Sequence, residues 1–126
     1  MKSMGQIDVD SKNLDTAKRN FLQSNVLEIN KKHIIGFIDN QAASDISNKR
    51  LYKYYSILKK LDYFLAIDFK KATKKDIQEL IIKINNMDNG YGQPISEWTK
   101  YTYKTILKRF YKWLNGNDEE YPSEVK

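Results

Sequence analysis

Three lysines recur at every fourth position near the end of the chain: Lys100, Lys104 and Lys108. In an α-helix this spacing places their side chains along one flank, because one turn takes about 3.6 residues. Thr99 lies at the start of the neighbouring face. Ammonium groups aligned in this way can bind phosphate groups, the most common contact between proteins and nucleic acids. A row of lysines is also typical of a solvated helix face, and both interpretations are open at this point.

A second group of lysines, earlier in the chain, also falls on one face of a predicted helix. Lys49, Lys53 and Lys60 share one helical face with Ser56, and Tyr52 and Tyr63 flank that face. Aromatic rings between lysines can pack on sugars and bases while the ammonium groups meet phosphates. Such tyrosines can equally cover the stems of neighbouring side chains.

Residues suited to other chemistry are few. His33 is the single histidine, and the chain has no cysteine, so we expect a structural histidine and no thiolate metal site. The paired carboxylates Glu119 and Glu120 lie in an acidic segment with no predicted pocket. The glycine-containing loop 89–94 lacks the spacing and the preceding strand of a phosphate-binding loop. We therefore expect no catalysis, no metal and no small-molecule cofactor for this chain.

The charge of the chain is unevenly distributed. Its 126 residues carry a net charge of +6. Residues 1–47 are neutral, residues 48–114 carry +9, and residues 115–126 carry −3. A basic central part indicates a polyanionic partner. No apolar run approaches the ~18 residues that a membrane-spanning helix requires, so no membrane partner is expected. The lack of cysteine suits a cytoplasmic protein.

The periodicity of apolar residues is helical throughout and predicts an all-α fold, a small bundle of four to five helices. We expect residues 1–23 to be a mobile segment with a short helix from Leu14, residues 24–114 to form the bundle, and residues 115–126 to be an acidic linker. Asn25 and Glu28 resemble a capping box for a first long helix, which the connection 39–45 would end. The predicted caps of the later helices are Ser47 or Asp45, and Thr73 with Asp76. Two positions are open for the Trp98 side chain, packing on the loop 91–94, which we favour, and contact with the DNA backbone.

The run from Ser96 to Leu114 resembles the last helix of the N-terminal core-binding (SAM-like) domain of tyrosine recombinases, the phage integrase family, most closely the archaeal type. The matching features are Ser96, the pair Trp98–Thr99 and the segment from Leu107 to Leu114. Further similarity lies in Ser44 or Ser47 followed by Arg50, Tyr54 and Leu58, in the segment 72–77, and in the tail 119–126.

This resemblance implies a helical domain that grips one side of duplex DNA near the crossover site. The second and last helices of the bundle would cross the major groove, and a catalytic domain would follow the present chain. It also implies contacts with other recombinase protomers assembled on DNA. The family's catalytic pattern of arginines and histidines does not occur in this chain. With the basic faces above, the candidate DNA-binding residues are Lys49, Arg50, Lys53, Lys60, Thr99, Lys100, Tyr103, Lys104 and Lys108.

The alternative function is a helical protein–protein interaction module that does not bind nucleic acid. Its anchors would be the exposed tyrosines and Trp98, because Trp and Tyr are the residues most enriched at interface hot spots. The two functions differ in salt dependence, since phosphate binding weakens with added salt and binding through aromatic anchors persists.

Overall fold

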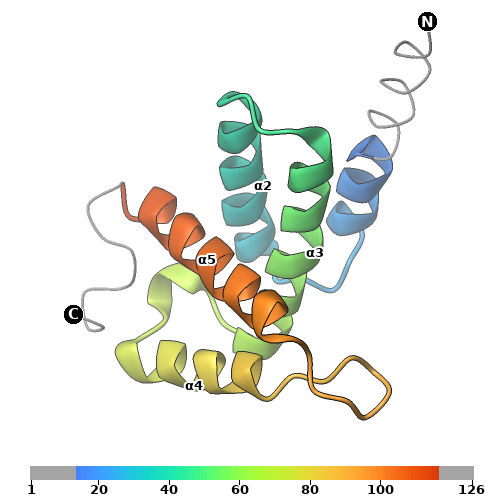
Figure 1. Cartoon of the computed structure of the whole chain (residues 1–126). Coiled ribbons are helices and arrows are strands. Elements are labelled where there is room, and N and C mark those ends of the chain that lie inside the picture. The colour runs from blue at the N-terminus through green and yellow to red at the C-terminus, as the bar shows by residue number, and fades with distance from the viewer. Residues whose placement is uncertain (1–13, 117–126) are drawn as a thin grey trace, which may run out of the picture.

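The computed structural model describes residues 14–116, so the predictions for residues 1–13 and 117–126 lie outside the described residues. Within residues 14–116 the chain is helical, with no strand and a single isolated bridge between Asp88 and Pro94 (Figure 1). The predicted small all-α bundle is therefore confirmed. Its elements are a helix over residues 14–22, α2 (Glu28–Ala42), α3 (Asn48–Leu65), the 3-10 helix η1 (Phe69–Lys71), α4 (Lys74–Asn85) and α5 (Glu97–Leu114).

The long helices are arranged around α5. Helices α2 and α3 lie side by side and run in opposite directions, and helix 14–22 stands beside α3 (Figure 1). Helix α4 lies across the lower end of the bundle, and α5 crosses diagonally and packs on α2, α3 and α4. The aromatic run of α5 explains this position, because its inward residues Ile106, Leu107 and Phe110 are buried.

Side-chain caps begin three of the helices, and those at Ser47 and Thr73 are as predicted, whereas the cap at Ser96 was not predicted. Ser47 accepts a hydrogen bond from the Arg50 N–H (3.3 Å), and Ser96 accepts one from the Thr99 N–H (3.1 Å). Thr73 forms the full capping box that precedes α4. Each cap satisfies an N–H group that the first helical turn leaves unpaired, so each one fixes where its helix begins.

The predicted start of α2 is wrong. The helix begins at Glu28 behind Leu27, which makes no side-chain cap. The hydroxyl of Ser24 instead donates to the Phe21 carbonyl (2.6 Å), so residues 23–26 turn at the end of the preceding helix. The turn buries Val26 and leaves Leu27 exposed. Helix α2 also continues to Ala42, so the connection to α3 is shorter than predicted.

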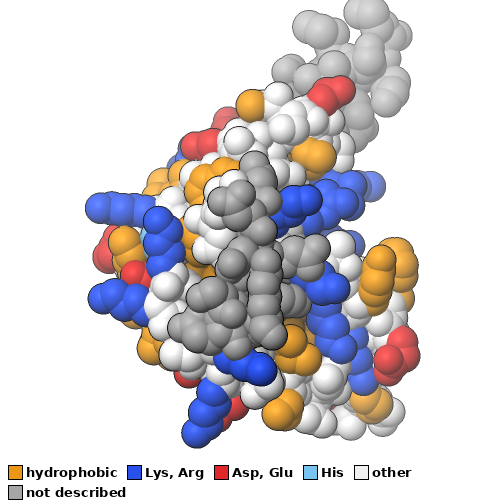
Figure 2. All heavy atoms as spheres, turned by 90° about the vertical axis from the view of Figure 1, so that its left-hand side faces the viewer, with side chains coloured by type: hydrophobic (Ala, Val, Ile, Leu, Met, Phe, Trp, Pro, Cys, Tyr) orange, Lys and Arg blue, Asp and Glu red, His pale blue; other side chains and the backbone are white. Residues whose placement is uncertain are grey.

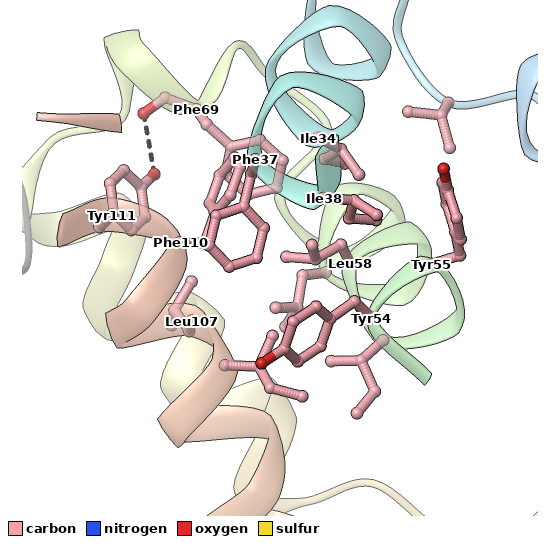
Figure 3. Close-up of a cluster of buried hydrophobic side chains, with 14 of the residues drawn as sticks. Ile34, Phe37, Ile38, Tyr54, Tyr55, Leu58, Phe69, Leu107, Phe110 and Tyr111 are labelled. Carbon is pink, nitrogen blue, oxygen red and sulfur yellow. Dashed lines mark hydrogen bonds between the residues drawn. The ribbon is translucent and has the colours of Figure 1, made fainter. Parts of the chain in front are cut away.

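A cluster of aromatic rings forms the centre of the core. Phe110 of α5 meets Phe37 of α2 and Phe69 of η1 edge to face, with ring centroids 5.5 and 4.9 Å apart. Tyr111 is fully buried beside them, and its hydroxyl donates to the Phe69 carbonyl over 2.8 Å (Figure 3). The sequence prediction placed Phe69 in a plain loop and did not assign Tyr111 to the core. Both residues join η1 to α5.

A buried polar network holds the turn between α3 and η1. Asn30 of α2 is fully buried and donates to the Asp62 carboxylate (2.7 Å) and to the Ile67 carbonyl (2.8 Å). Its side-chain oxygen accepts from the Phe69 N–H over 2.9 Å. Burial raises the pKa of Asp62, although the hydrogen bond from Asn30 opposes that shift.

The single histidine, His33, makes a further polar contact beside the turn between α3 and η1. His33 Nε2 lies 3.0 Å from Asp68 Oδ1, which connects α2 to the start of η1. Partial burial would raise the pKa of Asp68, but hydrogen bonds from the Lys70 N–H and from His33 outweigh it, so the pKa is lowered. The structural role expected for His33 agrees with this contact.

Candidate nucleic-acid interface

A cleft of about 300 Å³ lies between the N-terminal half of α3 and the outer side of α5. Three of the basic residues predicted on α3 form one wall, and a stripe of α5 forms the other. The lining residues are Ser47, Lys49, Arg50, Lys53, Tyr54, Trp98, Tyr101, Thr102, Thr105, Ile106 and Arg109. We call this the α3–α5 cleft.

The α3–α5 cleft is electropositive. Lys49, Arg50, Lys53 and Arg109 are all exposed, and none of them forms an ion pair with another residue of the described part of the chain. None of the residues that line the cleft is acidic. Cations gathered in a concave surface strengthen one another's field and attract polyanions, because neighbouring low-dielectric walls focus the potential.

Helix α3 holds its cations outward because its other side is packed. The Ser47 cap fixes the first turn, and Leu51 and Tyr54 are buried against the core. Lys49 and Lys53 are one turn apart, so they share the outer face with Arg50 between them. The predicted exposure of this basic face is confirmed.

Helix α5 contributes a different stripe from the one expected. The cleft is lined by Trp98, Tyr101, Thr102, Thr105 and Arg109, whose spacing of three, one, three and four residues marks one helical face. Lys104 immediately precedes Thr105 and therefore points about 100° away around the helix axis. The lysine flank of Lys100, Lys104 and Lys108 does not line the cleft.

The other predicted α5 residues have local roles. Lys100 pairs with Glu97 at 3.0 Å, and its side chain is only 17% exposed. Thr99 lies 2.9 Å from the Ser96 hydroxyl in the helix cap. Tyr103 packs on the core, and burial raises the pKa of its hydroxyl. Lys104 is half-buried and Lys108 is exposed. Their predicted contact with DNA stays a prediction, but they lie apart from Lys49, Arg50 and Lys53.

Trp98 does not pack on the loop 91–94 as expected. Its side chain is 70% exposed and stacks on Tyr101, which is 62% exposed, with ring centroids 5.7 Å apart and planes 28° apart. Tyr101 follows Trp98 by three residues, so the next turn of the same helix offers the nearest apolar surface. Neither Tyr101 nor Arg109 was identified from the sequence. Their positions on the helical face of α5 opposite its buried face could have identified both residues as exposed.

The loop 89–94 does not form a phosphate-binding loop. The Gly90 N–H donates to the Asp88 carboxylate (2.9 Å), and the Tyr91 N–H donates to the Asn89 side chain (2.8 Å). These N–H groups, which a phosphate would need, are satisfied within the loop.

Lys60, the remaining predicted residue, lies in a second and larger hollow. This hollow, of about 590 Å³, separates helix 14–22 from α3 and includes Phe21, Tyr52, Tyr55 and Tyr63. Tyr55 is buried there, and desolvation, with the negative charge of Asp39, raises its pKa to about 12. We call it the tyrosine hollow.

Lysine and arginine side chains also extend beyond the cleft. Figure 2 shows the face on the left of Figure 1, where lysine and arginine side chains run down the right half of the view and also stand out at its left edge and at the bottom. These side chains provide additional positive charge for a long polyanion.

Residues 14–116 contain no group of three His, Asp or Glu side chains placed to hold a metal ion. Within the same range, every helix is too short or too polar to cross a membrane. Comparison of the chain with protein families, with curated proteins and with solved structures returns no match. The function of the α3–α5 cleft therefore has to be inferred from its residues.

Proposed function

We propose that this chain is a DNA-binding module that grips one side of duplex DNA through the α3–α5 cleft. The observation that carries the proposal is the convergence of Lys49, Arg50, Lys53 and Arg109, from two helices, with no acidic residue among the cleft's lining. The resemblance of the run from Ser96 to Leu114 to the core-binding domain of tyrosine recombinases supports a role in site-specific DNA recombination and integration, and we propose that role. Catalysis would belong to a separate domain.

The physical basis is phosphate neutralisation. Each lysine or arginine that meets a phosphate releases a condensed counterion, so affinity falls as salt is added. Four cleft cations imply a slope of about −4 for log K against log salt concentration. Arg50 and Arg109 present planar guanidinium groups, which can also pair with guanine in the major groove, whereas the lysines act as point charges.

The test is a titration of a short labelled duplex at several salt concentrations, followed by fluorescence anisotropy. The double variant R50A/K53A should flatten the slope by about 2. The matched control is K74A/K75A, which removes the same charge from two exposed lysines outside the cleft at the start of α4.

Equal salt slopes in the two double variants would show that affinity depends only on the net charge of the protein. The cleft would then not be the DNA-binding surface. K100A/K104A measures the lysine flank separately. Because Lys100 is already paired with Glu97, we expect this variant to flatten the slope by less than R50A/K53A.

The tyrosine hollow supports a second candidate function, docking of a protein partner. Tyr63 is 75% exposed at its rim, and Tyr52 is also exposed there. Binding at this surface should survive high salt and respond to Tyr63→Ala, whereas duplex binding should not change in that variant.

A further inference from the structure

The stacked pair of Trp98 and Tyr101 forms one end of the α3–α5 cleft. The large aromatic residues in the second half of α5, among them Phe110 and Tyr111, are buried in the core, while these two stand largely in solvent. Exposing two large rings side by side is unfavourable in water unless a ligand covers them in the working state. The cations of the cleft favour an anionic ligand.

We propose that Trp98 and Tyr101 hold an unpaired base, so that the cleft binds DNA with a single-stranded segment more tightly than a closed duplex. This inference rests on the proposed DNA binding and specifies its substrate. In a closed duplex each base is covered by its neighbours, and a protein meets only phosphates, sugars and groove edges. An open aromatic face finds a matching partner only where a base is unstacked.

The dimensions of the cleft fit this ligand. The α5 stripe from Trp98 to Arg109 spans roughly 16 Å at 1.5 Å per residue. An aromatic pair at one end and a guanidinium at the other can therefore engage a base and a phosphate of the same strand. Lys49, Arg50 and Lys53 stand on the opposite wall, where they can meet further phosphates. Stacking does not read base identity, so the preference should be for an unpaired base of any kind.

The experiment compares two DNAs with the full chain by fluorescence anisotropy at one salt concentration. One is a short closed duplex, and the other is the same duplex with a single-stranded thymine overhang. The overhang should tighten binding about five-fold or more, the usual effect of stacking one base on an aromatic side chain.

Variants at the aromatic pair locate this effect. Trp98→Ala should abolish the preference for the overhang, so that both DNAs bind with the same affinity, and Trp98→Phe, which keeps an aromatic plane, should restore much of the preference. Tyr91→Ala is the matched control, since Tyr91 is an exposed ring in the loop before α5 and does not line the cleft. Because Trp98 is mostly exposed, circular dichroism should show Trp98→Ala folded.

Three results would overturn the inference. Equal affinity of the unmodified chain for both DNAs would show that no base is held, while leaving duplex binding intact. An equal loss of affinity for both DNAs in Trp98→Ala would show that the Trp98 ring contacts the sugar–phosphate backbone instead of a base. Loss of the preference in Tyr91→Ala would show that the unpaired base binds at the loop 89–94 instead. Failure to bind either DNA would refute the proposed function as well.

Discussion

Two fully buried tyrosines differ in one atom's surroundings, and this difference predicts opposite effects of the same substitution. The Tyr111 hydroxyl donates to the Phe69 carbonyl, whereas the Tyr54 hydroxyl has no hydrogen-bond partner among the described residues (Figure 3). Both side chains are 0% exposed. Tyr54→Phe and Tyr111→Phe therefore remove the same hydroxyl from equally buried rings.

The size of each effect follows from the free energy of burying a polar group. An unpaired buried hydroxyl costs about 1–3 kcal/mol, so Tyr54→Phe should leave the free energy of unfolding unchanged or raise it by about 1 kcal/mol. Tyr111→Phe removes a hydrogen bond and leaves the Phe69 carbonyl without that donor, which should lower the free energy of unfolding by about 1–3 kcal/mol.

Urea unfolding followed by circular dichroism measures both variants against the unmodified chain. A domain of this size changes its free energy of unfolding by about 1–1.5 kcal/mol per molar urea, so the two midpoints should differ by roughly 1–4 M. Destabilisation by Tyr54→Phe equal to that by Tyr111→Phe would refute the reasoning. In that case the Tyr54 hydroxyl would be satisfied by a buried water beneath the α3–α5 cleft.

Three further predictions concern other contacts. Gly36→Ala should destabilise the protein by about 1 kcal/mol in urea unfolding, because its Cβ would lie 2.9 Å from the Trp113 ring and overpacking outweighs the gain in helix propensity. If the Trp113 ring is the cause, the double variant Gly36→Ala/Trp113→Leu should recover part of the lost free energy of unfolding. Thr73→Ala should lower the thermal stability by about 1 kcal/mol through loss of the α4 capping box, and an unchanged melting temperature would contradict it. Because the folded pKa of Tyr55 is about 12 and its ordinary value is 10.0, its contribution to stability is complete below pH 10 and is lost as the pH rises toward 12. Tyr55→Phe should reduce this alkaline loss, measured as the change in urea midpoint between about pH 9 and about pH 11.

The helices that the sequence predicted best are those specified by local signals. The caps at Ser47 and Thr73, together with apolar stripes, define α3 and α4 within a few residues, and the apolar stripe alone defines α5. These signals act over three or four neighbours, so they can be read without knowing the fold. The predicted start of α2 at Asn25 was wrong, because residues 23–26 form a turn in which the Ser24 hydroxyl donates to the Phe21 carbonyl, and the helix begins only at Glu28.

The contacts that the sequence did not predict join distant residues. Asn30 meets Asp62, 32 positions away, and Tyr111 meets Phe69, 42 positions away. The periodicity of apolar residues along the sequence does not show which distant residues contact each other. The side of α5 that faces α3 was missed for a related reason. A helical pattern identifies the buried face, but it does not show which neighbouring helix lies beside each exposed flank.

The division of α5 into an inner and an outer half has a consequence for how its recognition can change. The inner half is fixed by packing against three other helices, so substitutions there alter the whole bundle. The outer stripe contributes little to the core, and its side chains can be exchanged while the backbone that carries them stays in place. A library randomised along this stripe should therefore yield mostly folded proteins with different ligand preferences. The residues to vary are Trp98, Tyr101, Thr102, Thr105 and Arg109.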